Sequence, residues 1–158
     1  MATLGIESNG RLEKTAVYFN GEQVGGLKEI FLNLDEDGTF DAVIQYEGSD
    51  KNLHTKNIFQ EPLFNVKIVE PSFTEEDAQE LQLLEVESNG DIENTTVFYN
   101  GEVLDGLVNV YIHIKGAKVK STGLSIFSSK KQDDQLAEFK AEFTFRNEDD
   151  SIETEAIY

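Results

Sequence analysis

Carboxylates are the most frequent reactive groups in this sequence. Asp and Glu make up 31 of the 158 residues, against 13 Lys and Arg, so the formal net charge is −18. Acids cluster at residues 35–37, 75–77 and 148–150. A pair of carboxylates can cleave glycosides by acid and base catalysis. Because acids occur throughout the chain, no pair is singled out, and we expect the clusters to present negative charge to a partner.

One acidic turn partly matches a calcium-binding loop. Residues 33–38 read NLDEDG, which fits the opening of such a loop if Asn33 takes its first position. The loop also needs a bidentate Glu at its twelfth position, where this chain has Ile44. We therefore expect an ordinary acidic turn and no metal site.

The remaining reactive residues do not form a known catalytic pattern. The chain has no cysteine, which excludes disulfides and thiolate nucleophiles, and its two histidines, His54 and His113, occupy unrelated places. No G-x-S-x-G elbow, P-loop, H-E-x-x-H or G-x-G-x-x-G motif is present. The sequence predicts a protein that is not an enzyme and needs no cofactor, with both histidines at surface or partly buried strand positions.

The segment between residues 115 and 138 differs in character from the rest of the chain. It carries five of the 13 basic residues, and it places apolar side chains among Gly and Ser. Long loops on a rigid scaffold often form binding surfaces. The alternative is an extra strand whose lysines offset nearby acids. We expect partner binding by Lys118, Lys120, Leu124, Ile126, Phe127, Lys130 and Lys131 of this segment, and by Asp35, Glu36, Asp37, Glu148, Asp149 and Asp150 of the acidic turns.

The scaffold that positions these residues is duplicated. Residues 6–34 recur at 86–114, 80 positions later, with 12 of 29 residues identical. Residues 40–59 recur at 139–158, with 5 of 20 identical and the apolar pattern kept. The second spacing is 99, so the second repeat carries 19 extra residues within the segment described above.

Short alternating runs between turn residues predict β-strands in both repeats. Asn-Gly at positions 20–21 and 100–101 predicts tight hairpins, and Asn-Gly at 9–10 predicts another, followed by a return strand over 12–19. Within 27–34, alternate residues should face the core, and residues 63–70 should form a further strand. Thr74 followed by three acids predicts a short helix over 75–81 between the repeats.

We therefore predict an all-β protein of two tandem homologous small β-sandwich or barrel-like units with one short connecting helix. The predicted boundaries are 1–73 for the first repeat, 74–82 for the helical connector and 83–158 for the second repeat, with the 19-residue insertion within 115–138. Units this small are marginally stable alone, so we expect them to pack on one another about a pseudo-twofold axis.

Composition and charge disfavour several partners and compartments. No window of the sequence resembles a membrane-spanning segment or a signal peptide. A net charge of −18 opposes direct contact with nucleic acid or an anionic membrane. The absence of cysteine fits a reducing compartment, so we expect a cytoplasmic protein, in the host cytoplasm if a phage encodes it.

The functional hypothesis is an acidic protein–protein interaction module, monomeric or homodimeric, that inhibits or sequesters a basic or nucleic-acid-binding protein. Carboxylates at phosphate-like spacing can occupy the basic groove of a nucleic-acid enzyme. Small acidic proteins that phages and mobile elements use against host defences provide the analogy, in charge and size. The alternative is a structural subunit of a virion or surface assembly, built from tandem β repeats.

Overall fold

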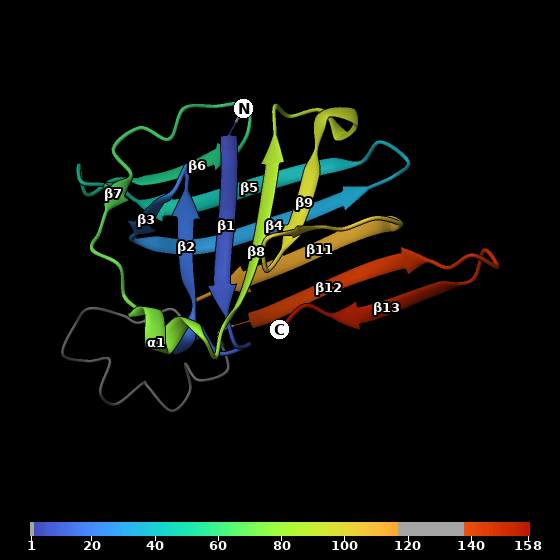
Figure 1. Ribbon diagram of the computed structural model, residues 1–158. Coiled ribbons are helices and arrows are strands. Elements are labelled where there is room, and N and C mark those ends of the chain that lie inside the picture. Colours follow the sequence, from blue (N-terminus) through green and yellow to red (C-terminus); the bar gives the residue numbers. More distant parts are fainter. Residues whose placement is uncertain (1, 117–137) are drawn as a thin grey trace, which may run out of the picture.

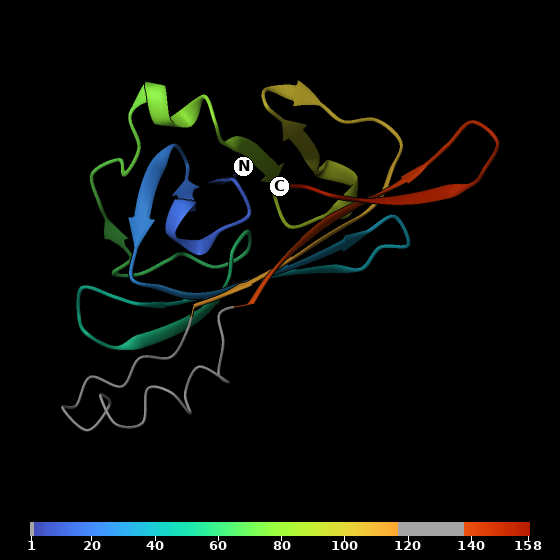
Figure 2. The same ribbon diagram turned by 90° about the horizontal axis from the view of Figure 1, so that it is seen from below.

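The computed structural model describes residues 2–116 and 138–158, and they form two antiparallel β-sheets stacked face to face (Figures 1 and 2). This confirms the predicted all-β class. The strands of one sheet cross those of the other steeply, as in an orthogonal sandwich. Sheet one has seven strands, in the order β10 (Glu102–Val103), β9 (Thr96–Tyr99), β8 (Gln82–Ser88), β1 (Ala2–Ser8), β2 (Ala16–Phe19), β3 (Glu22–Gly25) and β7 (Lys67–Ile68). Sheet two has six, in the order β13 (Ile152–Ala156), β12 (Glu138–Arg146), β11 (Leu107–Lys115), β4 (Leu27–Asp35), β5 (Phe40–Glu47) and β6 (Leu53–Asn57).

The repeat in the sequence is also a repeat in the structure. Strands β1 to β4 recur as β8 to β11, and β5 and β6 recur as β12 and β13. Details of the turns recur too: the hydroxyls of Ser8 and Thr15 lie 2.7 Å apart, and so do those of Ser88 and Thr95. Asn20 and Asn100, which open the two predicted hairpins, both have φ 52°. The two repeats therefore share a local architecture.

A pseudo-twofold axis relates the two repeats and passes through both sheets. Residues 80 positions apart are equivalent, so a residue that pairs with its own equivalent marks the axis. In sheet one, Gly5 of β1 pairs with Glu85 of β8. In sheet two, Leu32 of β4 pairs with Ile112 of β11. Each repeat thus supplies strands to both sheets, and the two repeats form one continuous β structure.

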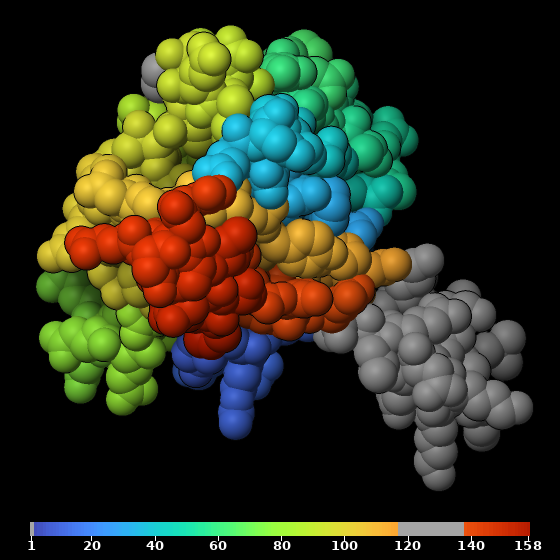
Figure 3. All heavy atoms as spheres, turned by 90° about the vertical axis from the view of Figure 1, so that its right-hand side faces the viewer, coloured from blue at the N-terminus to red at the C-terminus, as the bar shows by residue number. Residues whose placement is uncertain are grey.

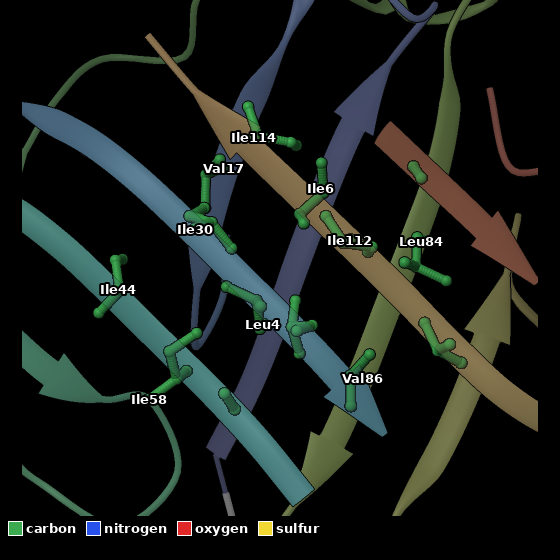
Figure 4. Close-up of a cluster of buried hydrophobic side chains, with 14 of the residues drawn as sticks. Leu4, Ile6, Val17, Ile30, Ile44, Ile58, Leu84, Val86, Ile112 and Ile114 are labelled. Atoms are coloured by element: carbon green, nitrogen blue, oxygen red, sulfur yellow. The ribbon is translucent and has the colours of Figure 1, made fainter. Parts of the chain in front are cut away.

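The core lies between the sheets, where the apolar faces of both repeats meet (Figure 4). In β4 the residues Ile30, Leu32 and Leu34 are buried and their neighbours are not, which confirms the predicted core face. The alternation places every second side chain on the inner face of the sheet. The main contributors from the other sheet are Leu4, Ile6, Leu84 and Val86.

Two predicted strands are shorter than expected. Residues 12–14 form a 3₁₀ turn, η1 (Leu12–Lys14), before β2 begins. The Thr15 hydroxyl donates to the Arg11 carbonyl at 2.6 Å and bonds to Ser8, and these contacts hold the 3₁₀ turn, so Asn9-Gly10 does not close a tight hairpin. The equivalent turn of the second repeat is η2 (Ile92–Asn94). Of the predicted strand over 63–70, only β7 forms.

The connecting helix is confirmed at its start and ends earlier than predicted. Helix α1 spans Glu75–Ala78. The Asp77 backbone N–H donates to the Thr74 hydroxyl at 3.1 Å, and the Thr74 N–H donates to the Asp77 carboxylate at 3.2 Å. This reciprocal capping box satisfies amides that the first helical turn leaves without partners.

Candidate functional site

The structure describes the acidic turns but not the insertion. Lys118, Lys120, Leu124, Ile126, Phe127, Lys130 and Lys131 all lie outside the described residues. Residues 35–38 join β4 to β5, and residues 147–151 join β12 to β13. The candidate site is therefore built from the second group of predicted residues, Asp35, Glu36, Asp37, Glu148, Asp149 and Asp150.

The two acidic turns lie at the same end of sheet two, on the face shown in Figure 3. The Glu36 backbone N–H donates to the Val108 carbonyl, 2.9 Å away, at the start of β11. The Glu36 side chain pairs with Arg146 at the end of β12. These contacts hold the β4–β5 turn against the strands that lead to residues 148–150.

Hydrogen bonds within the turns favour the ionised forms of Asp37 and Asp149. The Thr39 backbone N–H donates to Asp37 at 2.8 Å and lowers the pKa of that carboxyl below its ordinary value. The Ser151 hydroxyl donates to Asp149 at 2.6 Å and has the same effect on the Asp149 pKa. Among the described residues, no group of three or more His, Asp or Glu side chains is placed to hold a metal ion. The NLDEDG segment forms an acidic hairpin turn.

A groove of about 490 Å³ opens between the sheets beside the β4–β5 turn. We call it the acidic groove. Apolar side chains form much of its lining, among them Leu34, Ile92, Val97, Leu104, Leu107 and Val110. Four acids line it as well, and all but the first are exposed: Asp35, Glu36, Glu93 and Asp105. The groove combines an apolar surface with a concentration of negative charge.

The pseudo-twofold axis places a second, smaller groove at the opposite end, and the two differ in charge. This groove of about 260 Å³ is lined by the counterparts of the same apolar residues, including Leu12, Val17 and Leu27. Gly116 stands where Glu36 lies in the acidic groove, and Lys28 adds a positive charge. The symmetry of the backbone is kept, but four acids line the acidic groove, whereas the described lining of the smaller groove contains one, Glu29.

The acidic groove contains two functional candidates that sequence reasoning missed. Glu93 and Asp105 are single acids without acidic neighbours, so no cluster marks them. The sequence did contain one indication for Asp105. Its equivalent in the first repeat is Gly25, whereas most equivalent positions in the two repeats have similar residues. The groove itself depends on how the η2 loop and β10 lie against β11.

Both histidines lie on sheet two and neither lines the acidic groove. His113 Nε2 lies 2.5 Å from Glu29, and its Nδ1 lies 3.1 Å from Glu138. His54 bonds to Asp50 at 3.0 Å, and this hydrogen bond lowers the Asp50 pKa. Both imidazoles are largely covered, with 18% and 19% of the side chain exposed, in agreement with the predicted strand positions.

Tyr18 and Tyr158 stay protonated near neutral pH. Burial, together with the hydrogen bond that the Tyr18 hydroxyl donates to Glu7 at 3.0 Å, raises the Tyr18 pKa to about 12. Burial raises the pKa of Tyr158 well above its ordinary value, and the Tyr158 hydroxyl donates to the Ile6 carbonyl. These hydroxyls act as structural hydrogen-bond donors.

Comparisons with protein-family models, with curated proteins and with solved structures find no match. No helix in the described part of the chain is long and apolar enough to cross a membrane. We therefore base the functional proposal on the acidic groove and the charge around it.

Proposed function

We propose that this protein binds a basic protein partner through the acidic groove and inhibits or sequesters it. The observation that carries the proposal is the convergence of four acids on one apolar groove. Lysine and arginine side chains combine an apolar stem with a charged head, so they suit such a lining. The net charge of −18 adds long-range attraction that speeds association with a basic surface.

The charge of the groove is largely unopposed. Among the described residues that line it, none is Lys or Arg. In the described part of the chain, Glu36 pairs with one cation, Arg146, and both side chains remain partly exposed, at 48% and 41%. Exposed ion pairs of this kind contribute little stability, so an incoming cation can compete for Glu36 at low cost.

The insertion provides a separate expected contact. Gly116, the last described residue before it, lines the smaller groove at the opposite end of the molecule. The basic segment therefore begins beside the less acidic groove. We keep its role in partner binding as a proposal and assign the primary contact to the acidic groove.

A structural subunit is the second candidate, and β13 is the observation that favours it. All five residues of this edge strand are exposed, and exposed edges can pair with other chains. Glu153 and Glu155 alternate along the strand, however, and like charges would face each other in a self-paired edge. Sedimentation at rising concentration separates the candidates, because a tiling subunit assembles while a binding module keeps its size.

Reversing three groove charges should weaken capture of the partner. We expect E36K/E93K/D105K to bind at least about tenfold more weakly than the wild type, because the reversed charges repel a basic surface. The variant E75K/E76K/E80K makes the same change of net charge on the connector and should bind nearly as the wild type does. The measurement is capture from cell lysate at low and high salt, followed by titration of the captured protein.

The control variant separates binding at the acidic groove from attraction by the overall charge of the protein. If both triple variants lose binding equally, attraction is diffuse and the acidic groove is not the site. If neither loses binding, or if the captured proteins are not basic, the proposed function is wrong.

A further inference from the structure

Sheet one has two outer edges that the pseudo-twofold axis makes equivalent, and one of them carries an added strand. Strand β7 pairs with β3 on the first edge, with Ile68 opposite Val24 and Lys67 opposite Gly25. The Val69 backbone N–H extends this ladder by donating to the Gln23 carbonyl at 2.9 Å. The first repeat therefore shows directly what kind of segment covers this edge.

The equivalent edge, β10, has β9 as its one paired strand in the part of the chain that the structure describes. The Leu104 N–H points toward β9 and donates to the Val97 carbonyl at 3.0 Å. Because backbone groups alternate in direction along an antiparallel strand, the N–H and carbonyl of Val103 point outward. Val103 is 55% exposed, whereas its counterpart Gln23 is 8% exposed and its side-chain amide donates to the Ser72 hydroxyl.

This open edge forms part of the acidic groove. Val103, Leu104 and Asp105 are among its lining residues, beside Leu107 and Glu93. A strand added to β10 would therefore place one row of side chains against apolar and acidic groups. Backbone pairing would supply affinity, and these side-chain contacts would supply selectivity.

Asp105 makes the second edge selective for a strand unlike β7. Its counterpart is Gly25, where an added Cβ would lie 2.7 Å from a γ-methyl of Val69. Because Asp105 has a side chain where Gly25 has none, an added strand with valine at the position of Val69 would clash with Asp105. Lys67 lies opposite Gly25, so a basic residue at the same register would lie opposite the Asp105 carboxylate.

We propose that the β10 edge accepts an extended segment of the basic partner, paired as β7 pairs with β3. The segment carries Lys or Arg opposite Asp105 and a small residue two positions further along. This inference rests on the proposed function and specifies the chemistry of the partner at the same groove. The mode of recognition is strand addition to an exposed sheet edge.

A peptide derived from the segment that contains β7 tests the proposal. The probe is residues 63–72 with Val69→Ala, which removes the obstructing methyls, and Glu70→Lys, which adds a positive charge. We expect it to bind the full chain and to shift the backbone NMR signals of residues 102–105. The unsubstituted peptide should bind at least about tenfold more weakly, because it keeps both the clash and the acid.

Two variants of the protein separate strand addition from simple charge attraction. V103P removes the outward N–H and should weaken the probe at least about tenfold, while proline at such an edge position leaves the β9 pairing intact. D105G restores the residue of the first repeat, so it should bind probes with Val or Ala at position 69 about equally. An unchanged thermal unfolding midpoint confirms that each variant is folded.

Several outcomes would overturn the inference. It fails if the probe does not bind the wild type, if it binds V103P as tightly as the wild type, or if the shifted signals lie away from β10. A dimer that V103P dissociates would assign the edge to a second copy of this chain. If V103P captures the lysate partner normally while E36K/E93K/D105K does not, the proposed function stands and strand addition is wrong.

Discussion

Replacing Leu32 with alanine is expected to lower the free energy of unfolding by about 2–5 kcal/mol. Leu32 is fully buried and lies on the pseudo-twofold axis, paired with Ile112 on one side and Ala42 on the other. The substitution removes packing atoms at the point where the two repeats meet, and the paired backbones limit collapse into the cavity. Chemical denaturation followed by circular dichroism measures the loss.

The control and the shape of the transition test the shared core. Leu53→Ala, at a side chain that is 59% exposed, should change stability by less than about 0.5 kcal/mol. Ile112→Ala should cost as much as the Leu32 change, and both should shift one cooperative transition because each sheet contains strands of both repeats. Two separate transitions, with only one moved, would contradict a continuous β structure.

Gly26→Ala is expected to destabilise the protein more than Gly106→Ala, although the two glycines are equivalent. Both have left-handed backbones, with φ of 74° and 76°, so alanine pays a similar conformational cost of about 1–2 kcal/mol at each. An added Cβ at Gly26 would lie 2.4 Å from the Glu47 carbonyl oxygen. At Gly106 the nearest atom, the Arg146 carbonyl oxygen, is 3.4 Å away.

The extra loss at Gly26 should be about 1–3 kcal/mol, because the obstructing atom is backbone and the strand must shift to make room. The Glu47 N–H also donates to the Gly26 carbonyl at 2.8 Å, so a shift weakens the start of the β4–β5 pairing. The same denaturation measurement compares the variants. Equal losses would contradict this expectation, because they would show that the different Cβ-to-oxygen distances at Gly26 and Gly106 do not affect stability.

Local features of the fold were predictable from the sequence because their causes are local. The hairpin at Asn20 follows from residues that accept positive φ, and the cap at Thr74 follows from side chains that reach exposed amides. The buried face of β4 follows from alternation. The 3₁₀ turn at 12–14 depends on a hydroxyl contact between Ser8 and Thr15, which alternation does not register.

The sharing of both sheets between the repeats was harder to foresee. Pairing of β1 with β8, and of β4 with β11, joins residues far apart in the sequence, and an alternating pattern states which face is buried but not which strand lies beside it. The predicted mutual packing about an axis agrees with the structure. Only the structure shows that the repeats also join through backbone hydrogen bonds, between β1 and β8 and between β4 and β11.

The candidate site was predictable only where its acids are adjacent in the sequence. Asp35 and Glu36 belong to such a cluster and do line the acidic groove. Glu93, Asp105 and the open edge at Val103 can be recognised as parts of one site only from the structure, because residues far apart in the sequence line the groove together. The binding role of residues 148–150 and of the insertion stays a prediction.

Amide hydrogen exchange at Val103, with and without the captured basic partner, tests the acidic groove as the binding surface most directly. We expect the partner to slow exchange of this amide at least about tenfold, because its outward N–H gains a hydrogen bond within a ladder. Unchanged exchange at Val103, with protection appearing instead along β13 or in the insertion, would contradict the assignment.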